Sequence, residues 1–151
     1  MKIFSNNKKA FFEYTISDKI EVGIVLTGSE VKSIRAGQSR LNGAYAIIMS
    51  GELILINCNI AHYKFAYFQN KQNELRNRIL LVHKKELQKL TVEVAKKGIT
   101  LIPLKIYEND RGYIKLEIGV GKHKKLYDRR EEIKERDIKR ETMRELRGKK
   151  S

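Results

Sequence analysis

The sequence predicts a mainly β protein with α-helices, in which short antiparallel strands close into a small barrel and a charged tail follows. Three observations lead to this fold class. Apolar runs with strand periodicity recur along the first 120 residues, and each is bounded by turn residues such as glycine, serine, asparagine or aspartate. Two pairs of these runs are joined by short segments typical of β-hairpins. Two further segments show the periodicity of a helix.

The first strand is expected near the N-terminus. Phe12 and Tyr14 alternate with polar neighbours, which predicts a strand that ends at Ser17 and Asp18. Neighbouring residues of a strand face opposite sides of a sheet. We therefore expect one of Phe11 and Phe12 to be buried and the other to be exposed.

A second strand and a short helix are predicted next. The β-branched run Ile20–Leu26 predicts the strand, which ends at Thr27-Gly28. The segment Ser29–Gly37 predicts a helix, because Val31 and Ile34 lie three residues apart on one side. Its terminal glycine suits the left-handed conformation that ends many helices. The opposite side of this helix carries lysine and arginine.

The middle of the chain predicts a hairpin and a longer helix. Ala44–Met49 and Glu52–Asn57 are apolar runs joined by Ser50-Gly51, which is a tight-turn signal. Residues His83–Lys97 predict an amphipathic helix that stops at Gly98. The apolar face of this helix is expected to consist of Leu87, Leu90 and Val94.

A second hairpin completes the predicted body. Ile99–Tyr107 and Tyr113–Val120 flank a polar loop, and alternate residues of the later strand are apolar. About six short strands with two helices predict a closed antiparallel barrel similar to an oligonucleotide-binding fold, with flanking helices. A β-sandwich with the same number of strands would give a similar pattern, so that alternative stays open at this point.

Charge divides the chain near Val120. Residues 1–120 hold 19 Lys and Arg against 11 Asp and Glu, a net charge of +8, whereas residues 121–151 hold 13 against 7 and add +6. We therefore predict a β-barrel domain over residues 1–120 and a basic C-terminal tail over residues 121–151.

The predicted tail has helical propensity but no continuous apolar face that could pack against the body. Its apolar residues scatter around a helix and form no stripe, while several acid–base pairs four residues apart favour a helix. We expect the tail to be disordered when free and helical when bound to a charged partner. An exposed charged helix attached to the body is the alternative.

The composition narrows the class of partner. The chain has 151 residues, a net charge of +14 and a pI near 9.9, which favours a polyanionic partner over the alternative of a merely solvated basic surface. No apolar run approaches the ~20 residues that span a bilayer, and no signal core follows the N-terminus, so we expect a cytoplasmic protein. Cys58 is expected in the core. The scattered histidines suggest neither a metal nor a cofactor.

The motifs favour nucleic-acid binding over catalysis. Nothing has the spacing of an acid–base pair, an activated nucleophile or a phosphate-binding glycine loop, so we predict no enzyme. Asn7-Lys8-Lys9 beside Phe11-Phe12 combines phosphate donors with aromatic rings that can stack on bases. Arg76 and Arg78 precede an apolar run. Residues Lys122–Arg130 hold five cations and an aromatic within nine positions.

Three groups of residues carry a resemblance to a known family. They are Asn7–Ala10 with Tyr14; Glu21–Ser33 followed by Arg35-Ala36-Gly37; and Gly121-Lys122 with Lys124–Glu131. Over residues 5–147 the chain resembles the SmpB family, SsrA-binding proteins that partner tmRNA in bacterial trans-translation, the rescue of ribosomes stalled on messages without a usable stop codon. The resemblance implies an oligonucleotide-binding-like barrel, and a function of binding tmRNA and delivering it to stalled ribosomes.

The resemblance also implies which residues lie at the RNA. In the family the barrel holds the elbow of the tRNA-like part of tmRNA. Matching positions give Asn7, Lys8, Glu21 and Leu81 as residues that face the RNA or support those that do. With Lys9, Phe12 and Arg78 from the motifs, the expected RNA-binding set is Asn7, Lys8, Lys9, Phe12, Glu21, Arg78 and Leu81. Phe12 would stack where relatives often have histidine. Glu21 either accepts hydrogen bonds from base or ribose donors or orients a cation such as Lys8 or Lys9, and both alternatives stay open.

For the tail, the resemblance implies a helix in the empty mRNA channel of the small ribosomal subunit, near the decoding centre. The residues expected to contact the ribosome are Lys122, Lys124, Lys125, Tyr127, Asp128, Arg129 and Arg130. The implied partners are tmRNA and the ribosome with its RNA, and we expect a monomer with no membrane partner. Binding alone is the implied mechanism.

Two other functions are compatible with the residues taken alone. A general RNA-binding or ribosome-associated protein without tmRNA specificity would have the same barrel and the same basic extension. An RNA-processing enzyme would need a metal-binding carboxylate cluster on the barrel face, and Glu21 alone does not supply one.

Overall fold

The computed structural model describes residues 1–62 and 74–124, and the expectations for residues 63–73 and 125–151 lie outside the described part. The described strands are β1 (Lys2–Asn6), β2 (Tyr14–Ile24), β3 (Ser39–Arg40), β4 (Tyr45–Met49), β5 (Glu52–Ile56), β6 (Asn59–Ile60), β7 (Arg78–Leu81), β8 (Ile99–Glu108) and β9 (Ile114–His123). The described helices are α1 (Lys8–Glu13), α2 (Gly28–Arg35) and α3 (Lys84–Ala95).

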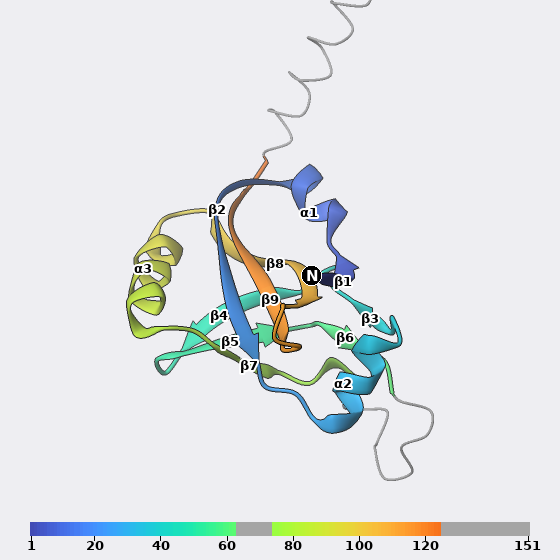
Figure 1. Ribbon diagram of the computed structural model, residues 1–151. Helices are drawn as coiled ribbons and strands as arrows, with labels where there is room; N and C mark the ends of the chain where they lie inside the picture. Colours follow the sequence, from blue (N-terminus) through green and yellow to red (C-terminus); the bar gives the residue numbers. More distant parts are fainter. Residues whose placement is uncertain (63–73, 125–151) are drawn as a thin grey trace, which may run out of the picture.

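The protein is mainly β, and its strand pairings return on themselves. The main sheet has the order β1-β8-β4-β5-β7-β2-β9, and β8 also pairs with β9, so that a ring of paired strands forms (Figure 1). All of these pairs are antiparallel. Both predicted hairpins are confirmed: β4 pairs with β5, and β8 pairs with β9. Ser50 and Gly51 between β4 and β5 have φ of 53° and 75°, the backbone of a type I′ turn.

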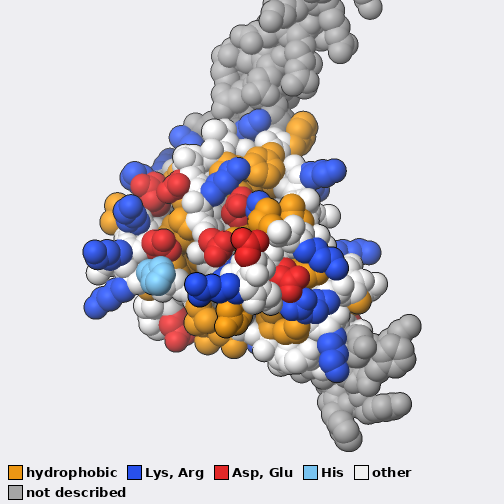
Figure 2. All heavy atoms as spheres, viewed as in Figure 1, with side chains coloured by type: hydrophobic (Ala, Val, Ile, Leu, Met, Phe, Trp, Pro, Cys, Tyr) orange, Lys and Arg blue, Asp and Glu red, His pale blue; other side chains and the backbone are white. Residues whose placement is uncertain are grey.

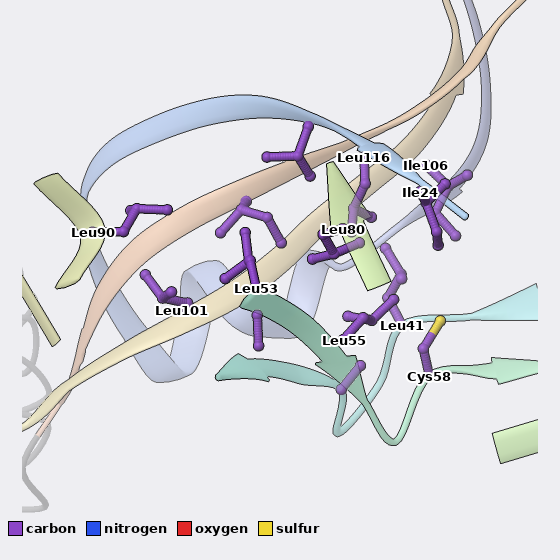
Figure 3. Packing of buried hydrophobic residues seen from close by; sticks show 14 of the residues in the cluster. Ile24, Leu41, Leu53, Leu55, Cys58, Leu80, Leu90, Leu101, Ile106 and Leu116 are labelled. Carbon is purple, nitrogen blue, oxygen red and sulfur yellow. The ribbon is translucent and has the colours of Figure 1, made fainter. Parts of the chain in front are cut away.

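The interior of the ring is the main hydrophobic core. Leu53 of β5, Leu80 of β7 and Leu101 of β8 are each at most 3% exposed and point into the same enclosed space (Figure 3). Leu90 of α3 also belongs to this core, with Leu87 and Val94 packed against it. The apolar face predicted for this helix is therefore confirmed, and burial of the leucines supplies most of the driving force for its docking.

Helix α2 closes another part of the core. Ile34 is fully buried, while Arg35 on the other side reaches Glu108 with 2.9 Å between Nη1 and Oε1. The helix begins with a capping box, in which the Thr27 side chain accepts from the Glu30 backbone N–H and the Glu30 carboxylate accepts from the Thr27 backbone N–H. Gly37 follows the helix with φ of 77°, as its sequence position predicted.

The N-terminal strand prediction is wrong at its start, because Lys8–Glu13 forms helix α1, and it is confirmed from Tyr14 onward, where β2 begins. Phe11 and Phe12 are both exposed, at 47% and 68%, and the buried residue of this helix is Ala10. Ala10 packs with Ile102 and Leu104 of β8 in a small second cluster outside the ring. This packing explains the difference, since alternation over four residues is a weak signal and the helix is stabilised by residues distant in sequence.

Two glycines of β9 make room for this second cluster. A Cβ at Gly119 would lie 2.8 Å from Cδ1 of Leu104, and one at Gly121 would lie 2.8 Å from Cδ1 of Ile102. Both distances are shorter than real carbon contacts. The side chain of Ile16 also covers both positions. The cluster under α1 therefore depends on two glycines about a hundred residues further along the chain.

Strand β2 is longer than predicted. Ser17 and Asp18 do not end a strand, because β2 continues from Tyr14 to Ile24 and its register with β9 shifts between Ile16 and Asp18. Such a bulge adds a residue on one strand and bends it. The turn-like residues thus mark an irregularity within one long strand that pairs with β9 along its whole length.

The end of the folded body also differs from the predicted boundary. Strand β9 extends to His123, three residues beyond Val120, and the Lys124 backbone N–H donates to the carbonyl of Glu13 at 2.9 Å. Lys122 and Lys124, which we assigned to the tail, therefore lie on the described body beside α1. In the part of the chain that the structure describes, no helix is long and apolar enough to cross a membrane.

Candidate nucleic-acid interface

Glu21 and Leu81 come together on the outer face of the ring. Gly23 of β2 pairs in register with Leu81 of β7 on one side and with Lys115 of β9 on the other. Glu21 lies two residues before Gly23 and thus projects to the same face. Leu81 is 59% exposed and covers the Gly23 backbone, where a Cβ would lie 3.1 Å from its own Cβ. The outer face therefore presents a carboxylate next to an exposed leucine.

The Glu21 carboxylate has a partner within the protein. It accepts a hydrogen bond from the hydroxyl of Tyr107, a residue of β8 that is 5% exposed. Burial, followed by the hydrogen bond and the negative charge of Glu21, raises the pKa of Tyr107 well above its ordinary value. The phenol thus stays protonated and keeps donating at any physiological pH. Lys9, one of the two cations that Glu21 was expected to orient in the second alternative, pairs with Glu13 at 3.6 Å between Nζ and Oε1.

Acidic and basic groups alternate around this carboxylate. Glu117 of β9 is the register partner of Glu21, and Lys105 of β8 lies 3.4 Å from Oε2 of Glu117. Lys105 also lies over the ring of Tyr107, with 5.4 Å from Nζ to the ring centroid. Figure 2 shows acidic side chains near the centre of this face, over β2 and β9, with lysine and arginine side chains around them. The face can therefore accept hydrogen bonds at its centre and bind phosphates at its border.

Helix α1 lies beyond one end of this face and carries the predicted basic and aromatic residues. Lys8, Lys9 and Phe12 are all exposed. Lys19 of β2 lies over the ring of Phe11, 5.3 Å from Nζ to the centroid, and so connects the helix to the sheet face. An exposed ring among cations is the combination that stacks on a base while neighbouring phosphates are neutralised.

The end of β9 adds further charge beside α1. Tyr14 pairs in register with His123, and their rings meet edge to face at 5.0 Å between centroids. Lys122 lies opposite Thr15 and is exposed. The structure therefore brings the base of the predicted tail next to the basic helix. The other expected ribosome contacts, Lys125, Tyr127, Asp128, Arg129 and Arg130, lie outside the described residues.

Asn7 belongs to the interior rather than to the RNA surface. It is 5% exposed, and its side-chain amide donates to the carbonyl of Pro103 at 2.9 Å and to that of Leu41 at 3.5 Å. These bonds tie the start of α1 to β8 and to the segment before β4. Asn7 thus orients the helix that carries Lys8, Lys9 and Phe12, and its burial favours the supporting role over a direct contact with RNA.

Arg78 is buried as well, which corrects the expectation that it faces RNA. Its side chain is 0% exposed, and its Nε lies 2.6 Å from Oε2 of Glu30. The same guanidinium donates to the carbonyls of Cys58 at 2.7 Å and Glu74 at 3.0 Å. Arg76 also binds the Glu30 carboxylate. The pair of arginines therefore fastens the start of β7 to α2.

The electrostatics of Glu30 follow from this network. Burial alone raises the pKa of the Glu30 carboxyl, but the hydrogen bonds from Arg76 and Thr27 and the charge of Arg78 outweigh burial and hold that pKa below its ordinary value. The neighbouring thiol of Cys58 is fully buried, as predicted, and burial raises its pKa to about 11. The thiol is therefore protonated and unreactive under ordinary conditions.

Sequence reasoning missed several residues of the outer face. They are Lys105 and Tyr107 of β8 and Lys115 and Glu117 of β9. Their spacing of two residues predicts that each pair shares one face of its strand, but the sequence does not show which residues of other strands lie beside them. In residues 1–62 and 74–124, no group of three or more His, Cys, Asp and Glu side chains is placed to hold a metal ion.

Comparisons with known proteins identify the family of this chain. The family model described as SmpB protein matches residues 4–148. An SsrA-binding protein of Pelobacter propionicus is 44% identical over 148 residues, covering 98% of this chain and 96% of that protein. An SsrA-binding protein of Paracoccus denitrificans is 50% identical over 145 residues, covering 96% and 92%.

Among solved structures, one similar chain comes from work described as "tmRNA-SmpB: a journey to the center of the bacterial ribosome". It is 45% identical with a TM-score of 0.67, and the match covers 80% of this chain and 84% of that chain. Because the family model and these relatives each match nearly the whole length, the chain belongs to the SmpB protein family.

Proposed function

We propose that this protein binds tmRNA and delivers it to stalled ribosomes for trans-translation. The family match over residues 4–148 is the observation that carries this function, because it includes both the folded body and the basic tail. Two further findings support it: relatives of similar length are SsrA-binding proteins, and the similar solved chain belongs to a tmRNA-SmpB study of the bacterial ribosome. The protein acts by binding in the cytoplasm, as a monomer, without cofactors.

The ring of strands serves as the RNA-binding platform in this proposal. We take it to be a closed barrel of the oligonucleotide-binding type, which the circular pairing of its strands supports. Leu81 offers an apolar surface to the tRNA-like part of tmRNA, and Glu21, aligned by Tyr107, accepts hydrogen bonds from base or ribose donors. A carboxylate repels phosphate, so its presence at the centre of the face favours a shaped RNA surface over a random polyanion.

Helix α1 and the end of β9 continue this platform toward the ribosome. The exposed rings of Phe11 and Phe12 stack on nucleotides, and Lys8, Lys9, Lys122 and Lys124 neutralise phosphates around them. The tail that follows enters the empty mRNA channel and reports that no message is present. The barrel thus fixes the RNA, and the tail senses the ribosome.

A binding titration tests this function. Full-length protein is titrated against tmRNA and, in parallel, against an elongator tRNA of similar charge density, at two salt concentrations. The proposal predicts that tmRNA binds more tightly by several kcal/mol and that the preference persists at the higher salt. Equal binding to both RNAs that falls steeply with salt would instead support a general RNA-binding protein.

A further inference from the structure

A cavity beside Leu81 has no role in the site described so far. It has a volume of about 330 Å³, within the ~300–1,000 Å³ range of pockets that hold small organic groups. Gly23 and Leu81, which join β2 to β7 on the outer face, form one wall. Tyr113, which directly precedes β9, and Ile114, the first residue of that strand, also line the cavity. The cavity therefore continues the Glu21–Leu81 surface toward the loop between β8 and β9.

Tyr113 provides an exposed aromatic surface at this cavity. The residue is 63% exposed, although its backbone is held at both ends. Its N–H donates to Oδ1 of Asn109 at 2.9 Å, and its carbonyl accepts from the Asn109 N–H at 2.9 Å. The loop thus holds the backbone of Tyr113 in place before any ligand binds, which lowers the entropic cost of stacking on this residue.

Two cations flank the same cavity. Lys115 lies opposite Gly23 in the sheet register. Arg35 is fixed by Glu108 at 2.9 Å and by the carbonyl of Gly112 at 3.2 Å, yet its side chain remains 43% exposed. An aromatic ring, an apolar wall and cations at the border are the chemistry that recognises an unpaired base together with its phosphate.

We propose that this cavity takes one unpaired nucleobase of the bound RNA, which stacks on Tyr113 while Lys115 binds the adjoining phosphate. The inference rests on the proposed function, since the RNA is the one held by the Glu21–Leu81 face. The glycine at position 23 is part of the site, because a Cβ there would lie 3.1 Å from the Cβ of Leu81 and would require this wall of the cavity to shift. The cavity gives the protein a means of reading a loop of the RNA rather than its charge alone.

Protein variants test the stacking surface first. Tyr113→Ala is expected to weaken tmRNA affinity about 5- to 150-fold, the equivalent of ~1–3 kcal/mol of stacking, while Tyr113→Phe stays within about twofold of wild type. Met49→Ala is a control, since Met49 is also an exposed side chain, 54% exposed at the end of β4, and is not among the residues assigned to the RNA surface. Lys115→Gln should make the plot of log affinity against log salt less steep, by a slope of about one, which corresponds to the loss of one phosphate contact.

An RNA-side scan then identifies the base. Single abasic substitutions are placed at the unpaired nucleotides of the tRNA-like part of tmRNA, and each RNA is titrated with wild type and with Tyr113→Ala. One abasic site should weaken binding of the wild type as much as Tyr113→Ala does, with no further loss when both changes are combined. Additive losses at every position would overturn the inference.

The two proposals fail in different ways. If Tyr113→Ala binds tmRNA like wild type while Glu21→Ala or Leu81→Ala weakens binding, the cavity does not hold a base and the proposed function stands. If wild type itself does not distinguish tmRNA from tRNA, the proposed function fails, and with it the cavity proposal.

Discussion

Removal of the Glu30 carboxylate is expected to destabilise the fold severely. This carboxylate is the acidic partner of Arg78, which is 0% exposed, and it also closes the capping box of α2 through the Thr27 N–H at 2.9 Å. A buried charge left without its partner costs about 3–5 kcal/mol, and loss of a cap costs about 1 kcal/mol. Glu30→Ala should therefore lose about 4–6 kcal/mol of a total stability that is ~5–15 kcal/mol for a domain of this size.

Related variants separate the two contributions. Thr27→Ala removes one cap acceptor and should cost about 1 kcal/mol. Glu30→Gln can keep a cap acceptor but removes the charge, so it should fall between Thr27→Ala and Glu30→Ala. Glu93→Ala is the matched control, because Glu93 is also a helical glutamate in an ion pair, with Lys96 at 3.0 Å, but that pair is exposed to solvent. Such a pair contributes at most ~1 kcal/mol.

The assay is urea unfolding followed by circular dichroism, with the midpoint and slope fitted separately. A loss below 1 kcal/mol for Glu30→Ala, or a loss equal to that of Glu93→Ala, would refute the reasoning. The pH dependence provides a second check. Since the pKa of Glu30 is lower in the folded state than its ordinary value of 4.5, its contribution is present above pH 4.5 and is lost as pH falls through the folded pKa. The difference in free energy of unfolding between wild type and Glu30→Gln should therefore become smaller as the pH falls below 4.5.

Two other changes have definite expected outcomes. Gly119→Ala places a Cβ 2.8 Å from Leu104 and should cost about 1–3 kcal/mol by displacing the cluster under α1, whereas Gly28→Ala, with nothing within 4 Å of its new Cβ, should be nearly neutral; thermal unfolding of both variants checks this. Glu21→Ala should keep its fold by circular dichroism and bind tmRNA more weakly in the titration, while unchanged affinity would remove Glu21 from the RNA-binding set.

Much of the fold was predictable from local pattern. The turn between β4 and β5, the buried face of α3 and the glycine that follows α2 each depend on residues close together in the chain. The capping box of α2 was also visible as Thr27-Gly28-Ser29-Glu30, a signal that the sequence reasoning passed over.

The errors arose where distant residues decide the structure. Helix α1 packs over glycines of β9, and β1 pairs with β8 more than ninety residues later, so neither could be recognised from neighbouring residues. Arg78 looked like an RNA contact because its partner Glu30 lies 48 residues away. For the site, alternation placed Glu21 on a strand face, but the Tyr107 hydroxyl that aligns it comes from another strand, 86 residues away.

In the proposed function, the folded body binds the RNA and the basic tail binds in the mRNA channel of the ribosome. The most direct test is a tagging assay on ribosomes stalled at the end of a message without a stop codon, supplied with alanyl-tmRNA and either the full chain or residues 1–124. This truncation keeps all of β9 and the Lys124 bond to Glu13, whereas a cut after Val120 would remove part of the strand. Both forms are expected to bind tmRNA within a few-fold of each other, and only the full chain is expected to restore tagging. Full tagging with residues 1–124 would contradict this proposal.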